Sequence, residues 1–226
     1  MKVTLLTYTP DAEKVVAAAA RLCYSPTDAS DLFEGMDEDK AERLLQKLVK
    51  SGHYSPFEHA NFTFAIDGIS RACSHQLVRH RLASYSQKSQ RYVKEKAFDY
   101  VVPASIRRDE ERLKKYEALM QQIQECYDEL VEDAVQAEDA RYLLPNACET
   151  NIVVTMNARE LRHFFGLRCC TRAQWEIRAM ANAMLKAVQE VAPLLFEGAG
   201  PSCISQGICY EGDMCCKKGL VEIRRR

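Results

Sequence analysis

A heptad-like repeat of apolar residues over positions 108–137 constrains the fold of this chain more than any other stretch. Its apolar positions step alternately by three and four residues, and they are Leu113, Tyr116, Met120, Ile123, Tyr127, Leu130, Ala134 and Ala137. This spacing predicts one long helix whose apolar seam packs in a bundle or against a second subunit. The helical register continues over 139–144, so Arg141 is expected near a helix end.

The rest of the chain alternates between strand and helix patterns. Period-two alternation predicts strands at 2–9, 61–67 and 151–157, and helical periodicity predicts helices at 12–22, 38–51, 70–81 and 173–196. Asp37 and Gly52 are expected to cap the helix at 38–51, and Asp67-Gly68 is expected to form a turn. In the last helix, Trp175 and the methionines are interpreted as core residues.

A basic segment at 79–92 concentrates hydrogen-bond donors without an acidic side chain. The triplet Arg79-His80-Arg81 is followed after seven residues by Ser89 and then by Arg91. Guanidinium groups bind phosphate bidentately, and hydroxyl groups complete the oxygen shell. The segment therefore predicts a local anion site, with a solvated basic loop as the alternative.

The position of these donors follows from the helix expected at 70–81. Gln76, Arg79 and His80 are spaced by three and four residues, so they are expected to share one side of that helix. The donors would then emerge from the helix end into a loop at 82–91. A second donor cluster, with Arg168 and Arg172, occupies 167–172.

Length and charge limit the class of protein. A chain of 226 residues is long enough for one substantial core and is interpreted as one domain. The net charge of -1, from 31 basic and 32 acidic residues, argues against a general polyanion binder. The sequence has no signal-peptide pattern and no apolar run of the roughly 18 to 20 residues that a membrane span needs. A soluble, cytoplasmic protein is expected.

Ten cysteines in such a chain are expected to be thiols rather than disulfides. Four that stand alone are interpreted as small core residues: Cys23, Cys73, Cys126 and Cys148. The C-terminal tail carries Cys203, Cys209 and the pair Cys215-Cys216 among glycines. A zinc or iron-sulfur site is the alternative there, but the five-residue gaps lack the short paired spacing of such sites, so no metal is expected.

The basic segment and its flanking motifs resemble the flavin-dependent thymidylate synthase family. The signature is Arg-His-Arg, seven residues and Ser, which is Arg79-His80-Arg81 through Ser89 here. Flanking motifs agree in order: Gly52-His53, Ser55-Pro56-Phe57-Glu58-His59, Phe62-Thr63-Phe64, Gln76, Arg141, Leu144-Pro145, Asn157-Ala158-Arg159, Leu167-Arg168 and Ala173-Gln174-Trp175-Glu176. The resemblance covers 1–197, which is expected to form a single domain, and leaves 198–226 as a Cys/Gly-rich tail.

The resemblance implies an α+β fold, with a mainly antiparallel central sheet packed by helices, a long-helix extension and no Rossmann fold. It implies an enzyme that reductively methylates dUMP to dTMP. Methylenetetrahydrofolate would be the carbon donor, NADPH the reductant, and FAD the hydride source and one-carbon relay. It also implies a homotetramer in which active sites lie between subunits, with Arg141 arriving from a neighbouring chain. No nucleic acid or membrane partner is expected.

The resemblance also implies roles for individual residues. Family positions that contact FAD correspond to Ser55, Arg79, His80, Arg81, Gln87, Asn157, Ala158, Arg159 and His163. Positions that hold the nucleotide correspond to Gln76, Leu77, Val78, Arg79, Gln87, Lys88, Ser89, Gln90, Arg91, Arg141 and Arg168. Arg168 corresponds to the arginine against the uracil edge, where a fixed positive charge would activate the ring. His53 is a further candidate, although a turn histidine is the simpler interpretation.

Two residues depart from the family pattern, and a cysteine nucleophile must be considered. Many relatives carry Glu where Gln87 stands and Asn where His163 stands, so an acid-base role at position 87 is in doubt. Cys169 and Cys170 lie beside Arg168, but the resemblance implies a reaction without an enzyme nucleophile, so Ser89 is assigned to positioning and polarisation. The alternatives are a single-stranded nucleic-acid-binding protein using residues 79–92, and a thiol or metal module in the tail.

Overall fold

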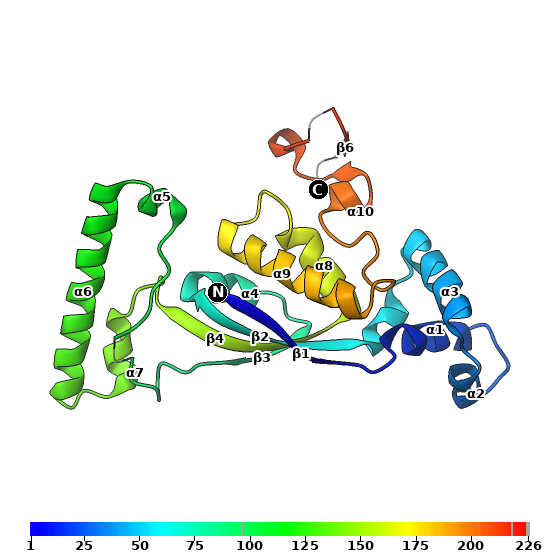
Figure 1. Cartoon of the computed structure of the whole chain (residues 1–226), viewed down its shortest axis with the longest axis horizontal. Helices are drawn as coiled ribbons and strands as arrows, with labels where there is room; N and C mark the ends of the chain where they lie inside the picture. The colour runs from blue at the N-terminus through cyan, green and yellow to red at the C-terminus, as the bar shows by residue number, and fades with distance from the viewer. Residues whose placement is uncertain (96, 218, 225–226) are drawn as a thin grey trace. The chain divides into compact units, whose positions relative to one another are not determined.

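A computed structural model describes residues 1–95, 97–217 and 219–224. Four strands form one sheet in the order β1-β2-β4-β3, and they are β1 (Lys2–Tyr8), β2 (Asn61–Ser70), β3 (Ala83–Gln87) and β4 (Glu149–Asn157). Thr63 of β2 contacts Thr155 of β4, whereas Gly68, further along β2, contacts the earlier Asn151, so these two strands are antiparallel. The sheet and its helices confirm the α+β fold with an antiparallel sheet (Figure 1).

The chain divides into two compact units, and both take parts of β1, β2 and β4. The first unit comprises Met1–Lys2, Ile66–Arg79 and Tyr85–Val153, and the second comprises Val3–Ala65, His80–Ser84 and Val154–Arg226. The second unit includes residues on both sides of position 197, and the domain boundary expected there stays a prediction.

The first unit is built around the long helix α6 (Glu110–Glu132), which lies with the short helices α5 (Ala104–Arg107) and α7 (Ala137–Ala140) in Figure 1. A 3-10 turn, η2 (Arg141–Leu143), follows α7. The α6 helix packs through Met120 against Phe98 and Cys148. The side chain of Asp109 caps α6 by accepting from the amide of Arg112.

The long helix expected at 108–137 is confirmed in type but is shorter than expected. It ends at Glu132, and Ala134 takes a left-handed φ of 62°. Of the eight seam positions, only Met120 and Tyr127 are buried in the chain. The rest of the seam is open or partly open.

The second unit contains three N-terminal helices, a pair of packed helices and the tail. Its elements are α1 (Ala12–Leu22), α2 (Ala29–Glu34), α3 (Glu38–Ser51), η1 (Ser55–His59), α8 (Ala158–Arg168), α9 (Trp175–Val191), α10 (Ser202–Ser205), β5 (Ile208–Cys209), η3 (Gly212–Met214) and β6 (Glu222–Ile223). Phe62 of β2, Phe165 of α8 and Phe196 form its aromatic core, with ring centroids 5.2 and 6.0 Å apart around Phe196. The helices expected at 12–22 and 38–51 are confirmed.

The caps of α3 are also confirmed. The Asp37 side chain accepts from the amide of Lys40 at 2.8 Å, and Gly52 takes the left-handed conformation that ends the helix, with φ of 70°.

Three expectations around the basic segment are wrong. Asp67-Gly68 does not form a turn between elements, because β2 continues to Ser70. Within the strand, Gly68 takes a left-handed φ of 68°. The next helix, α4, spans only Arg71–Leu77, so Gln76 and the Arg79-His80-Arg81 triplet do not share a helical side. The Tyr85 hydroxyl donates to the carbonyl of Leu77 at 2.9 Å, which satisfies that helix end. The loop expected at 82–91 contains β3.

Other local expectations also need correction. The α9 helix ends at Val191, two residues before Pro193, and not near 196. Trp175 begins α9 and is 42% exposed, so it is not a core residue, whereas Met180 and Met184 are buried. Cys73 and Cys148 are buried as expected, but Cys23 and Cys126 are exposed.

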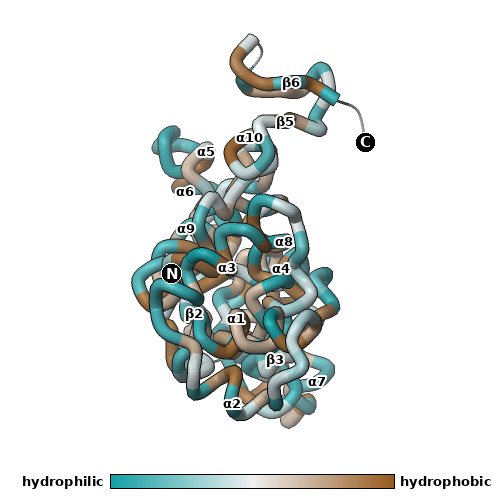
Figure 2. The backbone as a smooth tube through the Cα atoms, turned by 90° about the vertical axis from the view of Figure 1, so that its right-hand side faces the viewer, coloured by the Kyte–Doolittle hydropathy of each residue, from teal (hydrophilic) through white to brown (hydrophobic). Residues whose placement is uncertain are grey.

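Hydrophilic and hydrophobic residues are interspersed along the backbone in Figure 2. Within the described residues, no helix is both long and apolar enough to cross a membrane.

Candidate functional site

His80 lies at the centre of a largely buried polar array in the second unit, between Arg168 and Glu160. The Nε of Arg168 donates to Nε2 of His80 at 3.0 Å, and Nδ1 of His80 lies 3.4 Å from Oε1 of Glu160. Because Nε2 accepts a hydrogen bond, the neutral ring carries its proton on Nδ1, facing the carboxylate. Arg168 and Glu160 both belong to α8, so one helix holds both ends of the array. The guanidinium of Arg168 is thereby held by its Nε, and its two terminal nitrogens make no hydrogen bond to the residues that the structure describes.

Burial controls protonation in this array. Burial, with the charges of Arg168 and His163, lowers the pKa of His80 to about 4. Burial raises the pKa of the Glu160 carboxyl. His80 is therefore a neutral acceptor at pH 7, and it does not add a second positive charge beside Arg168.

The start of α8 carries three other predicted cofactor residues. The Asn157 side chain caps the helix by accepting from the amide of Glu160 at 2.9 Å, and Ala158 is fully buried. The Asn157 and Ala158 side chains therefore stabilise the fold, one as a helix cap and the other as a core residue. Arg159 is exposed and pairs with the Glu58 carboxylate.

The remaining predicted cofactor residues of this unit are near the surface. His163 is exposed, with its ring centroid 6.1 Å from that of His80, and it lines a cavity together with Arg159. Ser55 is exposed and its Oγ lies 3.0 Å from Nε2 of His53. The two candidates His53 and Ser55 are thus brought together. Arg81 is exposed.

In the first unit, Gln87 fixes the end of β3. Its Nε2 donates to Oγ of Ser74 at 2.9 Å and to Oγ1 of Thr150 at 3.2 Å. Ser74 uses its own proton on the carbonyl of Arg71 at 3.0 Å. An amide can donate to both hydroxyl oxygens and a carboxylate cannot, so the departure from Glu at this position fits its surroundings.

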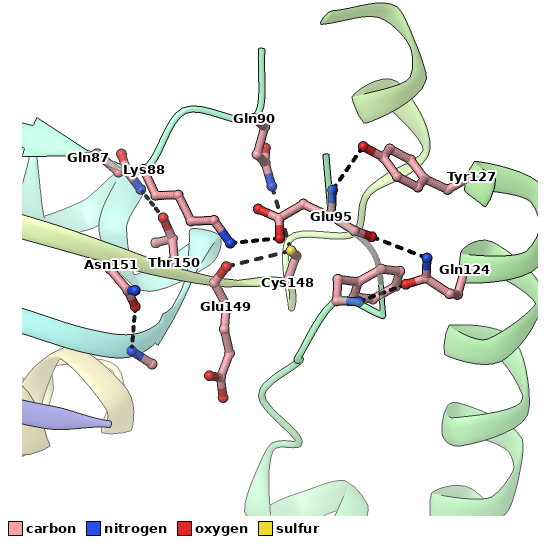
Figure 3. A network of polar contacts seen from close by, with 12 residues as sticks. Gln87, Lys88, Gln90, Glu95, Gln124, Tyr127, Cys148, Glu149, Thr150 and Asn151 are labelled. Atoms are coloured by element: carbon pink, nitrogen blue, oxygen red, sulfur yellow. Dashed lines mark hydrogen bonds and ion pairs between the residues drawn. The ribbon is translucent and has the colours of Figure 1, made fainter. Parts of the chain in front are cut away.

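The next residues are held by a buried network, shown in Figure 3. Lys88 Nζ lies 2.8 Å from Oε2 of Glu95, whose side chain is 8% exposed. The amide of Glu95 donates to the Tyr127 hydroxyl at 3.1 Å, and the Gln90 amide donates to Sγ of Cys148 at 3.6 Å. Two predicted nucleotide residues, Lys88 and Gln90, are thereby fixed to the core of the first unit.

Arg91 and Arg141, fifty positions apart, meet at one residue. Nε and Nη2 of Arg91 both donate to Oε2 of Glu138, at 3.0 and 2.8 Å, and Arg141 Nε donates to the Glu138 backbone carbonyl at 3.1 Å. Oγ of Ser89 accepts from the amide of Arg91 at 3.2 Å. The structure thus joins three predicted nucleotide residues in one chain.

The other predicted nucleotide residues differ in accessibility. Leu77 is fully buried, so its side chain is part of the core. Val78 and Arg79 are exposed, and Gln76 is half-buried. Arg79 belongs to the first unit, whereas His80 and Arg81 belong to the second.

The cysteines beside Arg168 and those in the tail are free thiols. Burial raises the pKa of Cys169 to about 12, so this thiol is protonated at neutral pH. Within the described part of the chain, no group of three or more His, Cys, Asp or Glu side chains is arranged to hold a metal ion.

Sequence reasoning missed the carboxylates of this site. Four predicted site residues have a carboxylate partner: Glu58 pairs with Arg159, Glu95 with Lys88 and Glu138 with Arg91, and Glu160 lies against His80. Glu58 and Glu138 had no local signal, because they lie 101 and 47 positions from their partners Arg159 and Arg91.

The comparisons with known proteins agree with one another. The model of the family described as "Thymidylate synthase complementing protein" matches residues 4–194. A flavin-dependent thymidylate synthase of Geobacter sulfurreducens is 55% identical, covering 100% of this chain and 97% of its own. Proteins of the same name from Clostridium tetani and Pyrococcus furiosus are 50% and 43% identical, covering 96% of this chain and 94% of theirs.

These relatives give no support to a nucleic-acid-binding protein or to a thiol or metal module. Their identity extends over nearly the whole chain, well beyond the signature around residue 80. The chain belongs to the flavin-dependent thymidylate synthase family.

Proposed function

We propose that this protein reductively methylates dUMP to dTMP, with methylenetetrahydrofolate as carbon donor, NADPH as reductant and FAD as cofactor. Family membership supports the reaction, and one observation in the structure supports its chemistry. That observation is the buried array of Glu160, His80 and Arg168.

The array gives Arg168 the properties of an electrostatic activator. A guanidinium is charged at any physiological pH, and a neutral His80 holds this one by its Nε. A pre-positioned positive charge stabilises negative charge that develops on a uracil ring without reorganisation of the site. In this proposal Arg168 touches the uracil edge and is the catalytic residue.

The donor set in the second unit fits a flavin dinucleotide. The Arg159 guanidinium can bind a phosphate. Its ion pair with Glu58 is half-exposed, so replacing the Glu58 carboxylate by a phosphate costs little free energy. Arg159 and His163 line a cavity of about 480 Å³, within the usual range for ligand sites. Bound FAD would supply hydride and one-carbon transfer. In this proposal Ser55, Arg81 and backbone groups near Asn157 complete its binding.

The residues around Glu138 fit a nucleotide phosphate. Arg91 and Arg141 both lie against Glu138, and Ser89 lies beside Arg91. A dianionic phosphate could replace the Glu138 carboxylate at Arg91 and take the Ser89 hydroxyl as a further donor. Ser89 has no adjacent base among the contacts described, so its role is positioning. The protonated Cys169 likewise supports a reaction without an enzyme nucleophile.

The proposal is tested by the reaction itself. The purified protein, incubated with FAD, NADPH, methylenetetrahydrofolate and dUMP, should form dTMP, and omission of any one component should stop it. A protein that turns yellow with FAD and oxidises NADPH faster when dUMP is present would support the assignment. Absence of flavin binding and of dTMP would contradict it.

We also infer a homotetramer with active sites shared between subunits, located in the cytoplasm and without a nucleic-acid partner. The partly open seam of α6 supports an assembly, because apolar side chains at heptad spacing pack against another helix. Light scattering of the active protein should give four chains. A fully active monomer would contradict shared sites.

A further inference from the structure

The C-terminal tail forms part of the cavity that contains Arg159 and His163. On one side the cavity is lined by these α8 side chains, and on the other by tail residues that include Ser202, Ser205, Gln206 and Tyr210. All of them belong to the second unit. The family model ends at residue 194, but the relative from Geobacter sulfurreducens aligns over the whole chain, tail included.

The chain is attached to α8 immediately before the tail begins. Arg162 donates through Nη1 to the carbonyls of Leu195 and Glu197, at 2.8 and 3.1 Å, and its guanidinium lies 4.9 Å from the centre of the Tyr54 ring. Further along, a Cβ on Gly166 would lie 3.7 Å from the carbonyl oxygen of Gly200, so the tail backbone runs beside α8 at van der Waals distance. Arg162 therefore anchors the chain just before the tail, and the tail backbone passes close to α8 at Gly200.

The tail also has a small core of its own. Cys209 of β5 and Cys215 are 7% and 6% exposed, and they line a second, smaller cavity together with Leu167 and Cys170 at the end of α8. The strands β5 and β6 pair in parallel, with Cys209 opposite Ile223. Buried side chains and strand pairing make the tail a folded element rather than a loose end.

The chemistry of the two sides is complementary to a dinucleotide. The α8 side presents the Arg159 guanidinium and the His163 imidazole, which suit an anionic diphosphate. The tail side presents hydroxyl and amide groups, which suit ribose and base. The Tyr210 hydroxyl donates to Oε1 of Gln206 at 3.1 Å, so the Gln206 amide is held in orientation while its NH2 group can donate to a ligand.

We propose that residues 202–210 form one wall of the FAD site, with Gln206 as a cofactor-binding residue that Tyr210 positions. This inference rests on the proposed function, because it assigns the cavity to FAD. The tail then has a role that its cysteine pattern did not reveal: it retains the cofactor.

The test is FAD binding by the full-length protein stripped of flavin, measured by titration of flavin fluorescence. Gln206→Ala should raise the Kd for FAD about three- to tenfold, the effect of losing one or two hydrogen bonds. Ser205→Tyr should raise the Kd more than Gln206→Ala, since it places a ring in the cavity. The matched control is Ile204→Ala, which alters an exposed residue of the same short helix that does not line the cavity. It should bind FAD as the wild type does.

Each result has a defined meaning. Wild-type affinity in both Gln206→Ala and Ser205→Tyr would overturn the inference, as would an equal loss in Ile204→Ala. Circular dichroism that matches the wild type ensures that a loss of affinity is not a loss of fold. If the wild-type protein binds FAD and forms dTMP while these variants bind FAD normally, only the tail assignment fails. If the wild type does not bind FAD, the proposed function fails with it.

Discussion

Arg168 and His80, 88 positions apart in sequence, are joined by a hydrogen bond of 3.0 Å from Nε to Nε2. The contact links the end of α8 to the middle residue of the Arg79-His80-Arg81 triplet. Glu160, two turns earlier on α8, lies on the other side of the same ring. The triplet therefore contributes to the chemistry in the second unit through His80, by orienting the guanidinium of Arg168.

The buried His80 should make the folded state sensitive to acid. Its pKa is about 4 in the folded state and 6.5 in an unfolded chain, so the unfolded state takes up the proton first as the pH falls. This stability contribution is present above pH 6.5 and is lost between pH 6.5 and about 4, to a limit of about 3 kcal/mol. Glu160, whose pKa is raised, acts with the opposite sign and offsets part of the loss.

Melting temperatures of wild type and His80→Gln between pH 7.5 and 4.5 measure this effect. The wild type should lose more on acidification than the variant. The exposed His59 in η1 gives the control His59→Gln, which should follow the wild type. An equal loss in the wild type and in His80→Gln would show that the protonation of His80 does not matter.

Removing the Glu138 carboxylate should tighten nucleotide binding. The Glu138 carboxylate accepts hydrogen bonds from the Arg91 guanidinium, and a bound phosphate must displace this carboxylate. The pair is exposed, so Glu138→Gln should lower the Kd for dUMP only about two- to fivefold, whereas Arg91→Ala should weaken binding. Asp139→Asn removes the same charge from the exposed neighbouring position and serves as the control. Calorimetric titration would reject the competition if Glu138→Gln bound dUMP no better than Asp139→Asn.

Gln87→Glu should destabilise the first unit despite its similar shape. The Ser74 hydroxyl already donates to the carbonyl of Arg71, so it accepts from Gln87, and a carboxylate has no proton to give. We expect a loss of about 1 to 3 kcal/mol in the free energy of unfolding, measured with urea. Gln87→Met, which loses the same bonds without adding a charge, should lose less. The reverse order would mean that the hydroxyls reorient freely.

The Lys88 and Glu95 pair should show asymmetric energetics. Glu95 is the more buried partner, with 8% of its side chain exposed against 34% for Lys88. Lys88→Met leaves the buried Glu95 carboxylate without its cation and should lower the free energy of unfolding by about 3 to 5 kcal/mol. Glu95→Gln leaves a lysine that can reach water and should lower it less. The double variant Lys88→Met and Glu95→Gln should recover most of the loss. A double variant as unstable as the sum of the two single variants would exclude coupling of the pair.

Local signals in the sequence predicted some elements accurately. The bounds of α1 and α3 were correct because their patterns and caps, such as Asp37 and Gly52, lie within a few residues of the helix. The shared acceptor of Arg91 and Arg141 was not predicted, because Glu138 lies 47 positions from Arg91.

Non-local contacts explain what the sequence did not reveal. The β3 strand lies in a polar segment that reads as a loop, and it forms next to β4, where the amide of Lys88 donates to the carbonyl of Asn151. Trp175 was assigned to the core by helical spacing, but it is the first residue of α9 and is 42% exposed, whereas the next two residues, Glu176 and Ile177, are buried. The resemblance identified Arg168 and His80, whereas their contact with each other and the Glu160 carboxylate required the fold.

The central claim is that Arg168 activates the uracil ring as a fixed charge, separately from cofactor binding. Arg168→Ala should bind FAD with wild-type affinity in a fluorescence titration while dTMP formation falls by about 10² to 10³. Arg172→Ala, which removes an exposed arginine four positions further on, should form dTMP at the wild-type rate. An Arg168→Ala variant that still makes dTMP at the wild-type rate would contradict the account.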